Sequence, residues 1–196
     1  MSPRRVEMQR QTSETDIRLA LNLDGSGQAE LQTGIGFLDH LFTALVRHAR
    51  FDLRLTCRGD LHIDDHHTAE DCALALGAAI DRALGERRGV TRFGYAYAPL
   101  DEALARAVVD LSGRPFARIE LGLQRPMLGA LACENVAHVL GSLATSARVT
   151  LHVDVLHGLN DHHRAEAAFK ATALALRQAV ARDGTDDVPS TKGVLV

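Results

Sequence analysis

The chain has 196 residues, of which 46% are hydrophobic and 24% are charged, and its formal net charge is −3 at pH 7. This composition is typical of one globular domain, or of two small fused ones, and gives no reason to expect binding to nucleic acid or to a membrane. No apolar run is long enough to span a bilayer. Three cysteines without a zinc-binding spacing, Cys57, Cys72 and Cys133, predict reduced thiols in a cytoplasmic protein.

The first half of the chain predicts four strands and two helices. In chain order they are strands at 6–12, 15–23 and 28–33, a helix at 37–49, a strand at 51–57 and a long helix that ends near Leu84. Residues 15–23 alternate between apolar and polar side chains, and turn residues lead from them into 28–33. These two strands are therefore predicted to form a hairpin.

The second half predicts a similar series of elements. They are strands at 103–111 and 116–123, a helix at 134–147, a strand at 149–155 and a long helix that ends near Ala181. The order of hairpin, helix, strand and long helix thus occurs twice. We expect an internally duplicated α+β unit of mostly antiparallel sheets packed on long helices, with two pseudo-symmetric halves in a single domain over 1–196. The repeats cover about 1–92 and 93–196.

Each long helix begins with the pattern Asp-His-His-x-Ala-Glu, at 65–70 and again at 161–166. Residues four apart share one face of a helix, whereas adjacent residues point about 100° apart. The first histidine and the glutamate of each copy can therefore bind one metal ion together, and the second histidine must serve another ion. The pairs are His66 with Glu70 and His162 with Glu166, and the remaining histidines are His67 and His163.

Two more histidines occupy equivalent places in the repeats. His40 and His138 each lie in a helix that precedes the last strand of its half, within similar sequences. This equivalence makes them candidates for a third histidine, one for each ion. Sites with several nitrogens and one carboxylate favour manganese, iron, zinc, cobalt or nickel over calcium or magnesium. The alternative, that the paired histidines are solvated groups at two helix starts, would be preferred for a single copy but not for two.

Several cations predict that the substrate is an anion. The segment 188–193 places two hydroxyl groups beside a lysine and a glycine, and such a segment can bind an anion through side chains and backbone N–H groups. Arg92 and Arg114 lie in turn-like contexts, and Lys170 is one turn beyond Glu166. Each of these would ordinarily be a solvated cation. As a set beside a metal cluster they indicate a phosphorylated substrate.

The whole chain resembles the imidazoleglycerol-phosphate dehydratases of histidine biosynthesis, in the form without a fused phosphatase domain. The motifs that carry this resemblance are GFLDH at 36–40, DDHHTAED at 64–71, DLSGRP at 110–115, NDHHRAEAAFK at 160–170 and PSTKG at 189–193. One departure is Gly36, where many members have proline or another residue. We expect it to affect the local turn and not the chemistry.

The resemblance implies a hollow homo-oligomer of twenty-four subunits, with two Mn²⁺ ions per active site at subunit contacts. It assigns His40, His67, His162 and Glu166 to one ion, and His66, Glu70, His138 and His163 to the other. It makes Glu14 the acid–base residue. The alternatives are Glu102 and Asp101, because they are the counterparts of the Glu14 region in the second repeat. The substrate-binding and phosphate-binding positions are Glu14, His48, Arg92, Arg114, Lys170, Ser190 and Lys192.

The implied reaction dehydrates D-erythro-imidazoleglycerol phosphate to imidazole acetol phosphate. In this hypothesis the metals stabilise the substrate ring as an imidazolate, the adjacent hydroxyl leaves to give a diazafulvene-like intermediate, and Glu14 removes the next proton. Two other classes stay open. A two-metal phosphoester hydrolase would need more carboxylates, and a metal-storage or structural oligomer would have no need of Glu14, Arg92, Arg114 and the 190–192 segment.

Overall fold

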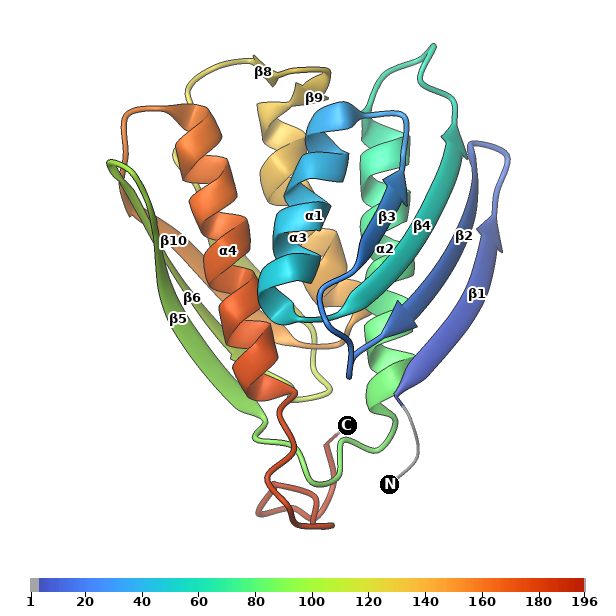
Figure 1. The fold of residues 1–196 in the computed structure, drawn as a ribbon, viewed down its shortest axis with the longest axis vertical. Helices are drawn as coiled ribbons and strands as arrows, with labels where there is room; N and C mark the ends of the chain where they lie inside the picture. The colour runs from blue at the N-terminus through green and yellow to red at the C-terminus, as the bar shows by residue number, and fades with distance from the viewer. Residues whose placement is uncertain (1–3, 196) are drawn as a thin grey trace.

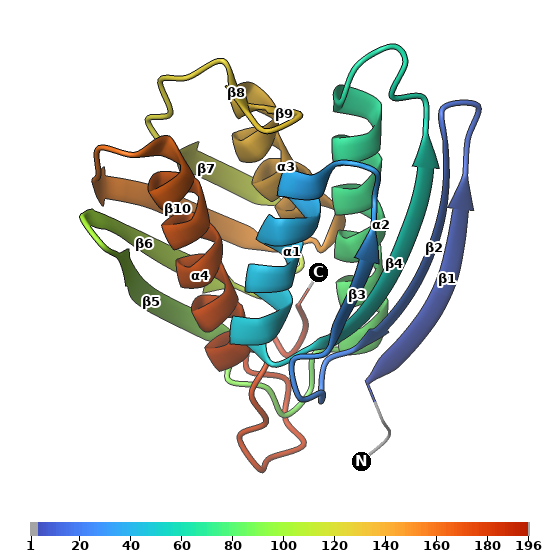
Figure 2. The ribbon, with the colours of Figure 1, turned by 45° about the horizontal axis from the view of Figure 1, so that its top comes forward.

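The computed structural model describes residues 4–195 as two four-stranded sheets on either side of a layer of four helices (Figures 1 and 2). The first half contains β1 (Arg5–Gln11), β2 (Thr15–Asn22), β3 (Ala29–Gln32), α1 (Gly36–Ala49), β4 (Asp52–Gly59) and α2 (His66–Leu84). The second half contains β5 (Phe93–Leu100), β6 (Ala103–Asp110), β7 (Phe116–Glu120), α3 (Cys133–Ser146), β10 (Thr150–His157) and α4 (Asp161–Ala179), with the short pair β8 (Met127–Leu128) and β9 (Leu131–Ala132) before α3.

The two sheets have the same topology, which confirms the predicted α+β class and the two similar halves. Their strand orders are β1-β2-β4-β3 and β5-β6-β10-β7. In each sheet the first three strands are antiparallel and the fourth lies parallel to its neighbour. Sheets of this mostly antiparallel kind can bury one face and expose the other. The inward residues of β2 and β6 alternate as expected, for example Ile17, Leu19 and Leu21.

The predicted hairpins, β2 with β3 and β6 with β7, are both wrong, and in the second half β10 separates β6 from β7. β4 pairs with β2 along its whole length and separates it from β3, which lies parallel to β4 on the far side. The reason is local: Asp52 at the start of β4 accepts backbone hydrogen bonds from Ser26 at 2.8 Å, Gly27 at 3.2 Å and Gln28 at 3.0 Å. The turn residues therefore carry the chain across the end of β4 and do not reverse it. The hairpins within the two four-stranded sheets are β1–β2 and β5–β6.

Strand β5 is absent from the predicted elements because its pattern is inverted. Its large side chains, Phe93, Tyr95 and Tyr97, are exposed on the outer face, and its small residues face α4. A side chain at Gly94 would collide with the backbone carbonyl of Ala175 in α4. Close approach of the helix therefore requires glycine here. Because the residues that face α4 are small and the exposed ones are large and apolar, the strand lacks the usual pattern of apolar residues inside and polar residues outside.

The alanine-rich faces of α2 and α4 are buried between the two sheets. Small side chains let helices approach closely: a Cβ atom at Gly77 of α2 would lie 2.5 Å from the carbonyl oxygen of Leu143 in α3. α2 packs against α3, and α1 packs against α4. Helices from the two halves therefore interleave within one layer, and the N-terminal ends of α1, α2 and α4 lie at the same end of the molecule, the top in Figure 1.

Candidate metal centres

Both Asp-His-His-x-Ala-Glu copies lie at the start of a helix, and in each the side chain two residues before the first histidine accepts the backbone N–H of that histidine. Asp64 Oδ1 accepts the backbone N–H of His66, and Asn160 Oδ1 accepts that of His162, each at 2.9 Å. Side-chain oxygens at this position satisfy N–H groups that a helix start leaves free. These equivalent hydrogen bonds fix the first histidine of each copy in the first turn, although α2 begins at His66 and α4 begins one motif position earlier, at Asp161.

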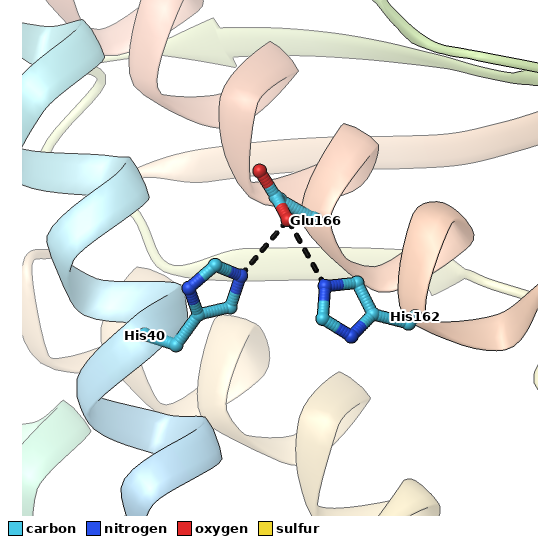
Figure 3. Close-up of side chains that lie close together, drawn as sticks. All are labelled: His40, His162 and Glu166. Carbon is cyan, nitrogen blue, oxygen red and sulfur yellow. Dashed lines mark hydrogen bonds and ion pairs between the residues drawn. The ribbon is translucent and has the colours of Figure 1, made fainter.

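The first cluster joins α1 of the first half to α4 of the second (Figure 3). The carboxylate oxygen Glu166 Oε2 lies 2.8 Å from His40 Nε2 and 3.2 Å from His162 Nε2. Phe37 packs beside both rings, with centroid separations of 5.7 and 5.1 Å. We call this group the α1–α4 cluster.

The second cluster joins α2 of the first half to α3 of the second. Glu70 Oε1 lies 2.9 Å from His138 Nε2, and Glu70 Oε2 lies 3.9 Å from His66 Nε2. The rings of His66 and His138 are stacked, with centroids 4.9 Å apart. This α2–α3 cluster thus repeats the composition of the first, again with residues from both halves.

The donor atoms of each cluster lie within 4.8 Å of one another, which is compatible with one ion bound by all three side chains. The tautomer of His66 also fits a metal ligand. Asn135 donates through Nδ2 to Asp65 at 3.0 Å, which turns its Oδ1 toward His66 Nδ1 at 2.9 Å. The proton of His66 is therefore on Nδ1, and the lone pair of Nε2 faces Glu70 and His138. The residues present fit a divalent transition metal.

The second histidine of each copy lies outside both clusters. His67 Nδ1 is 2.9 Å from Asp60 Oδ2, and His163 Nδ1 is 2.7 Å from Glu102 Oε2. These hydrogen bonds to carboxylates raise the pKa of both imidazoles. In one chain, therefore, the structure brings together three of the four residues predicted for each ion.

Two candidate bases differ in their surroundings. Glu14, in the turn between β1 and β2, is 47% exposed, and its Oε1 lies 3.7 Å from His67 Nε2. Glu102, in the corresponding turn between β5 and β6, has both carboxylate oxygens in hydrogen bonds. The N–H of Asn160, with His163 and the N–H of Leu159, lowers the pKa of Glu102 to about 2. Of the two, Glu14 is the carboxylate open to a ligand.

A lysine completes the α1–α4 cluster. Lys170 Nζ lies 2.7 Å from Glu166 Oε1. Burial alone would raise the pKa of Glu166, but its hydrogen bonds with Lys170 and His40 lower that pKa to about 2. Glu166 therefore stays ionised at every physiological pH. Partial burial and the charge of Lys170 lower the pKa of His48, one more predicted substrate residue.

The other predicted phosphate-binding residues lie elsewhere in the chain. Arg92 forms two contacts with Asp110, at 2.8 and 3.1 Å, and donates to the carbonyl of Pro189 at 2.7 Å, so it joins the Ser190–Lys192 segment. This region follows the C-terminal end of α4, at the bottom of Figure 1. α4 has 19 residues, and a helix of that length is roughly 28 Å long. Arg114 is exposed beyond β6. Within one chain, therefore, Arg92, Arg114 and the Ser190–Lys192 segment do not lie at the histidine clusters.

Several residues around the clusters were missed by reasoning from the sequence. Asp60 and Asn135 hold His67 and His66, as described above. The motif aspartates also have a role: Asp65 accepts the backbone N–H of Ala132 at 2.7 Å, and Asp161 accepts that of Arg125 at 2.7 Å. Both therefore fasten the segment that leads to His138. The presence of an aspartate in both motif copies was the available signal, but its partners are remote in sequence.

Comparison with known proteins decides the family. The family model described as imidazoleglycerol-phosphate dehydratase matches residues 33–176. The chain belongs to the imidazoleglycerol-phosphate dehydratase family. Relatives of that name include one from Phytophthora nicotianae, 59% identical over 98% of this chain and 42% of the relative, and one from Kluyveromyces lactis, 53% identical over 98% of each.

Solved dehydratase structures share the fold. The enzyme from Pyrococcus furiosus, solved in complex with (S)-C348, has a TM-score of 0.83 and 37% identity, with 96% of this chain and 100% of that one covered. The Staphylococcus aureus enzyme has a TM-score of 0.82 and 31% identity, with 91% and 99% covered. Members of the family are hydro-lyases of histidine biosynthesis, and the family implies a metal cofactor. Among residues 4–195, no helix combines the length and apolar character needed to cross a membrane.

Proposed function

We propose that this protein dehydrates D-erythro-imidazoleglycerol phosphate to imidazole acetol phosphate, in the cytoplasm, as a metal-dependent step of histidine biosynthesis. The observation that carries this proposal is the pair of clusters, His40–His162–Glu166 and His66–Glu70–His138. Each has the same donor set and each combines both halves of the chain. We further propose that the repeats meet near residues 92 and 93 within one domain.

Two Mn²⁺ ions are the proposed cofactors. The ligands would be His40, His67, His162 and Glu166 for one ion, and His66, Glu70, His138 and His163 for the other. Once bound, the metals supply Lewis acidity to the imidazole ring of the substrate. The hydrogen bond of His66 Nδ1 with Asn135 leaves its Nε2 directed at the cluster, and Glu166, with its pKa lowered to about 2, is in the ionised form that a metal ion requires.

The proposed active enzyme is a homo-oligomer, and twenty-four subunits are expected. Three observations support assembly. His67 and His163 lie outside the clusters of their own chain, so a second copy would supply them. Arg92 and the Ser190–Lys192 segment lie about a helix length from the clusters. The outer face of the second sheet exposes Tyr95, which is 66% accessible, together with other large apolar side chains, as interaction surfaces do.

The proposed base is Glu14. Its turn is fixed because Thr12 Oγ1 accepts the N–H groups of Glu14 and Thr15, at 3.1 and 3.0 Å, while its carboxylate is 47% exposed and lies 3.7 Å from His67 Nε2. Glu14 would take the proton from the carbon next to the one that loses hydroxide, and the resulting enol would become the ketone. The net change is loss of one water molecule.

The remaining predicted residues would bind the substrate and its phosphate group. Lys170 lies at the α1–α4 cluster beside Glu166, and His48 is near Lys170. Arg92, Arg114, Ser190 and Lys192 would reach the same substrate from a neighbouring copy. Holding the phosphate fixes the orientation of the imidazole and of the carbon that faces Glu14.

The test combines metal content, turnover and particle size. The protein is stripped with a chelator, Mn²⁺ is added back, and ketone and inorganic phosphate are both followed while light scattering gives the mass. The proposal predicts that ketone formation returns with Mn²⁺, without phosphate release, in a large particle. Release of phosphate would favour the hydrolase, and tight metal binding with neither product would favour metal storage.

A further inference from the structure

The two histidines outside the clusters are held by carboxylates from different elements. Asp60, at the end of β4, binds His67, and Glu102, in the β5–β6 turn, binds His163. We propose that Asp60 and Glu102 are positioning residues that hold Nε2 of His67 and His163 ready to bind a metal ion. This inference rests on the proposed metal-dependent function and assigns a role to two residues outside the ligand set.

Glu102 fixes the start of α4 and the ring of His163 with one carboxylate. Its Oε1 accepts the N–H groups of Leu159 at 3.0 Å and Asn160 at 2.8 Å, and its Oε2 accepts the Nδ1 hydrogen of His163 at 2.7 Å. Asn160 is itself the cap of α4. The β5–β6 turn, the cap and the histidine are therefore joined at a single side chain. Glu102, which the sequence offered as an alternative base to Glu14, thus has a positioning role in this inference.

Asp60 makes the equivalent connection in the first half by another route. Its Oδ2 accepts from His67 Nδ1 at 2.9 Å, and its backbone N–H donates to the carbonyl oxygen of Glu14 at 3.1 Å. The β1–β2 turn is thus joined to His67 through Asp60. As a result Glu14 Oε1 lies 3.7 Å from His67 Nε2, just as Asp101 Oδ2 lies 3.9 Å from His163 Nε2.

The chemical consequence follows from the tautomers of imidazole. A neutral ring has one N–H and one lone pair, and an acceptor at Nδ1 places the hydrogen there. The lone pair is then on Nε2, which in both histidines faces away from the positioning carboxylate. Ligand histidines commonly have such a partner, and its loss typically lowers metal affinity about 10–100-fold.

The experiment titrates the assembled protein with Co²⁺ and records its visible absorption, which reports the coordination of the ion. The variants are Glu102→Ala, Glu102→Gln and His163→Ala, with Asp60→Ala and His67→Ala as the parallel set. Glu120→Ala, an exposed carboxylate paired with Arg118, is the control. Glu102→Ala should weaken one of two Co²⁺ sites by about 10–100-fold and change its spectrum. Glu102→Gln should recover part of that affinity, because the amide oxygen can still accept from Nδ1.

The outcomes separate this inference from the proposed function. If His163→Ala loses one site but Glu102→Ala binds both ions with wild-type affinity and spectrum, the positioning role is wrong and the metal proposal stands. If Glu102→Ala only lowers the unfolding temperature, Glu102 is structural and the inference is again wrong. If His163→Ala retains both sites unchanged, the proposed ligand set itself is wrong.

Discussion

The two halves of the chain have the same ligand pattern but different surroundings. The outer face of the first sheet exposes mainly polar and charged side chains such as Arg5, Glu7 and Gln9, whereas the second exposes Phe93 and Tyr95. The second histidine of the motif is held from β4 in one half and from the β5–β6 turn in the other. The two halves therefore share the spacing of their metal-binding side chains but differ in the hydrogen bonds and the outer surface around them.

The largest expected effect is loss of one ligand from each cluster. His162→Ala and His66→Ala remove residues from different halves that share one place in the motif. Each should lower bound Mn²⁺ from two ions to one per chain and reduce kcat by about 100-fold or more, since a direct ligand matters at least as much as its partners. Metal analysis and steady-state kinetics check this. Loss of activity in only one of the two variants would contradict the claim that the clusters are equivalent.

Glu14→Gln should have an effect of comparable size. Removing a general base typically costs about 10²–10⁴ in rate, so kcat should fall by that factor while KM changes little. The matched change in the other half, Glu102→Gln, should act mainly on metal affinity. Comparing kcat, KM and Co²⁺ binding for the pair distinguishes the two roles. Normal turnover by Glu14→Gln would show that another group removes the proton.

Assembly should depend on the second sheet more than on the first. Tyr95→Glu places a charge on the exposed face of β5, and Gln9→Glu places one on the exposed face of β1. If the aromatic face is an interface, burying the new charge is unfavourable, and Tyr95→Glu should shift the particle to smaller species. Sedimentation velocity measures the distribution. Equal effects of both variants would contradict the asymmetry.

Two glycines test the packing of helices from the two halves. A Cβ atom at Gly77 would meet the backbone of α3, whereas one at Gly141 meets nothing within 4 Å. Gly77→Ala should lower the free energy of unfolding by about 1–3 kcal/mol, as overpacking does. Gly141→Ala should raise it by about 0.5–1 kcal/mol through helix propensity. Denaturant unfolding checks both signs, and a stabilising Gly77→Ala would contradict the close α2–α3 contact.

The smallest effect concerns pH. The hydrogen bond to Asp60 raises the pKa of His67 above its ordinary value of 6.5. Metal binding needs the neutral ring, so affinity should fall as pH decreases, beginning above pH 6.5. Asp60→Asn lowers this pKa, and the fall should then begin at lower pH. Co²⁺ titrations across pH measure the midpoint, with Glu30→Gln, whose partner is Arg54 on the outer face, as the control that should not move it.

Local spacing predicted much of this molecule. The four-residue separation in each motif was enough to place His66 near Glu70 and His162 near Glu166, because a helix enforces it. The partnership of His40 with α4 could not be predicted from spacing, since it arises when helices of the two halves interleave. The predicted strand order is wrong because the turn at 24–27 carries the chain across the end of β4, where Asp52 accepts the backbone N–H groups of residues 26–28. The role of Asp60 could not be found by comparing the repeats. Its counterpart Glu102 lies in the β5–β6 turn, whereas Asp60 follows β4, so the two residues do not align.

The most direct test of the central claim is a crystal structure with Mn²⁺, with anomalous scattering used to locate the ions. The account predicts two manganese peaks per chain, one at His40, His162 and Glu166 and one at His66, Glu70 and His138. A histidine from a neighbouring copy, His67 or His163, should complete each. A single peak, or manganese bound away from both clusters, would contradict the claim that the duplicated motif builds two metal centres from both halves.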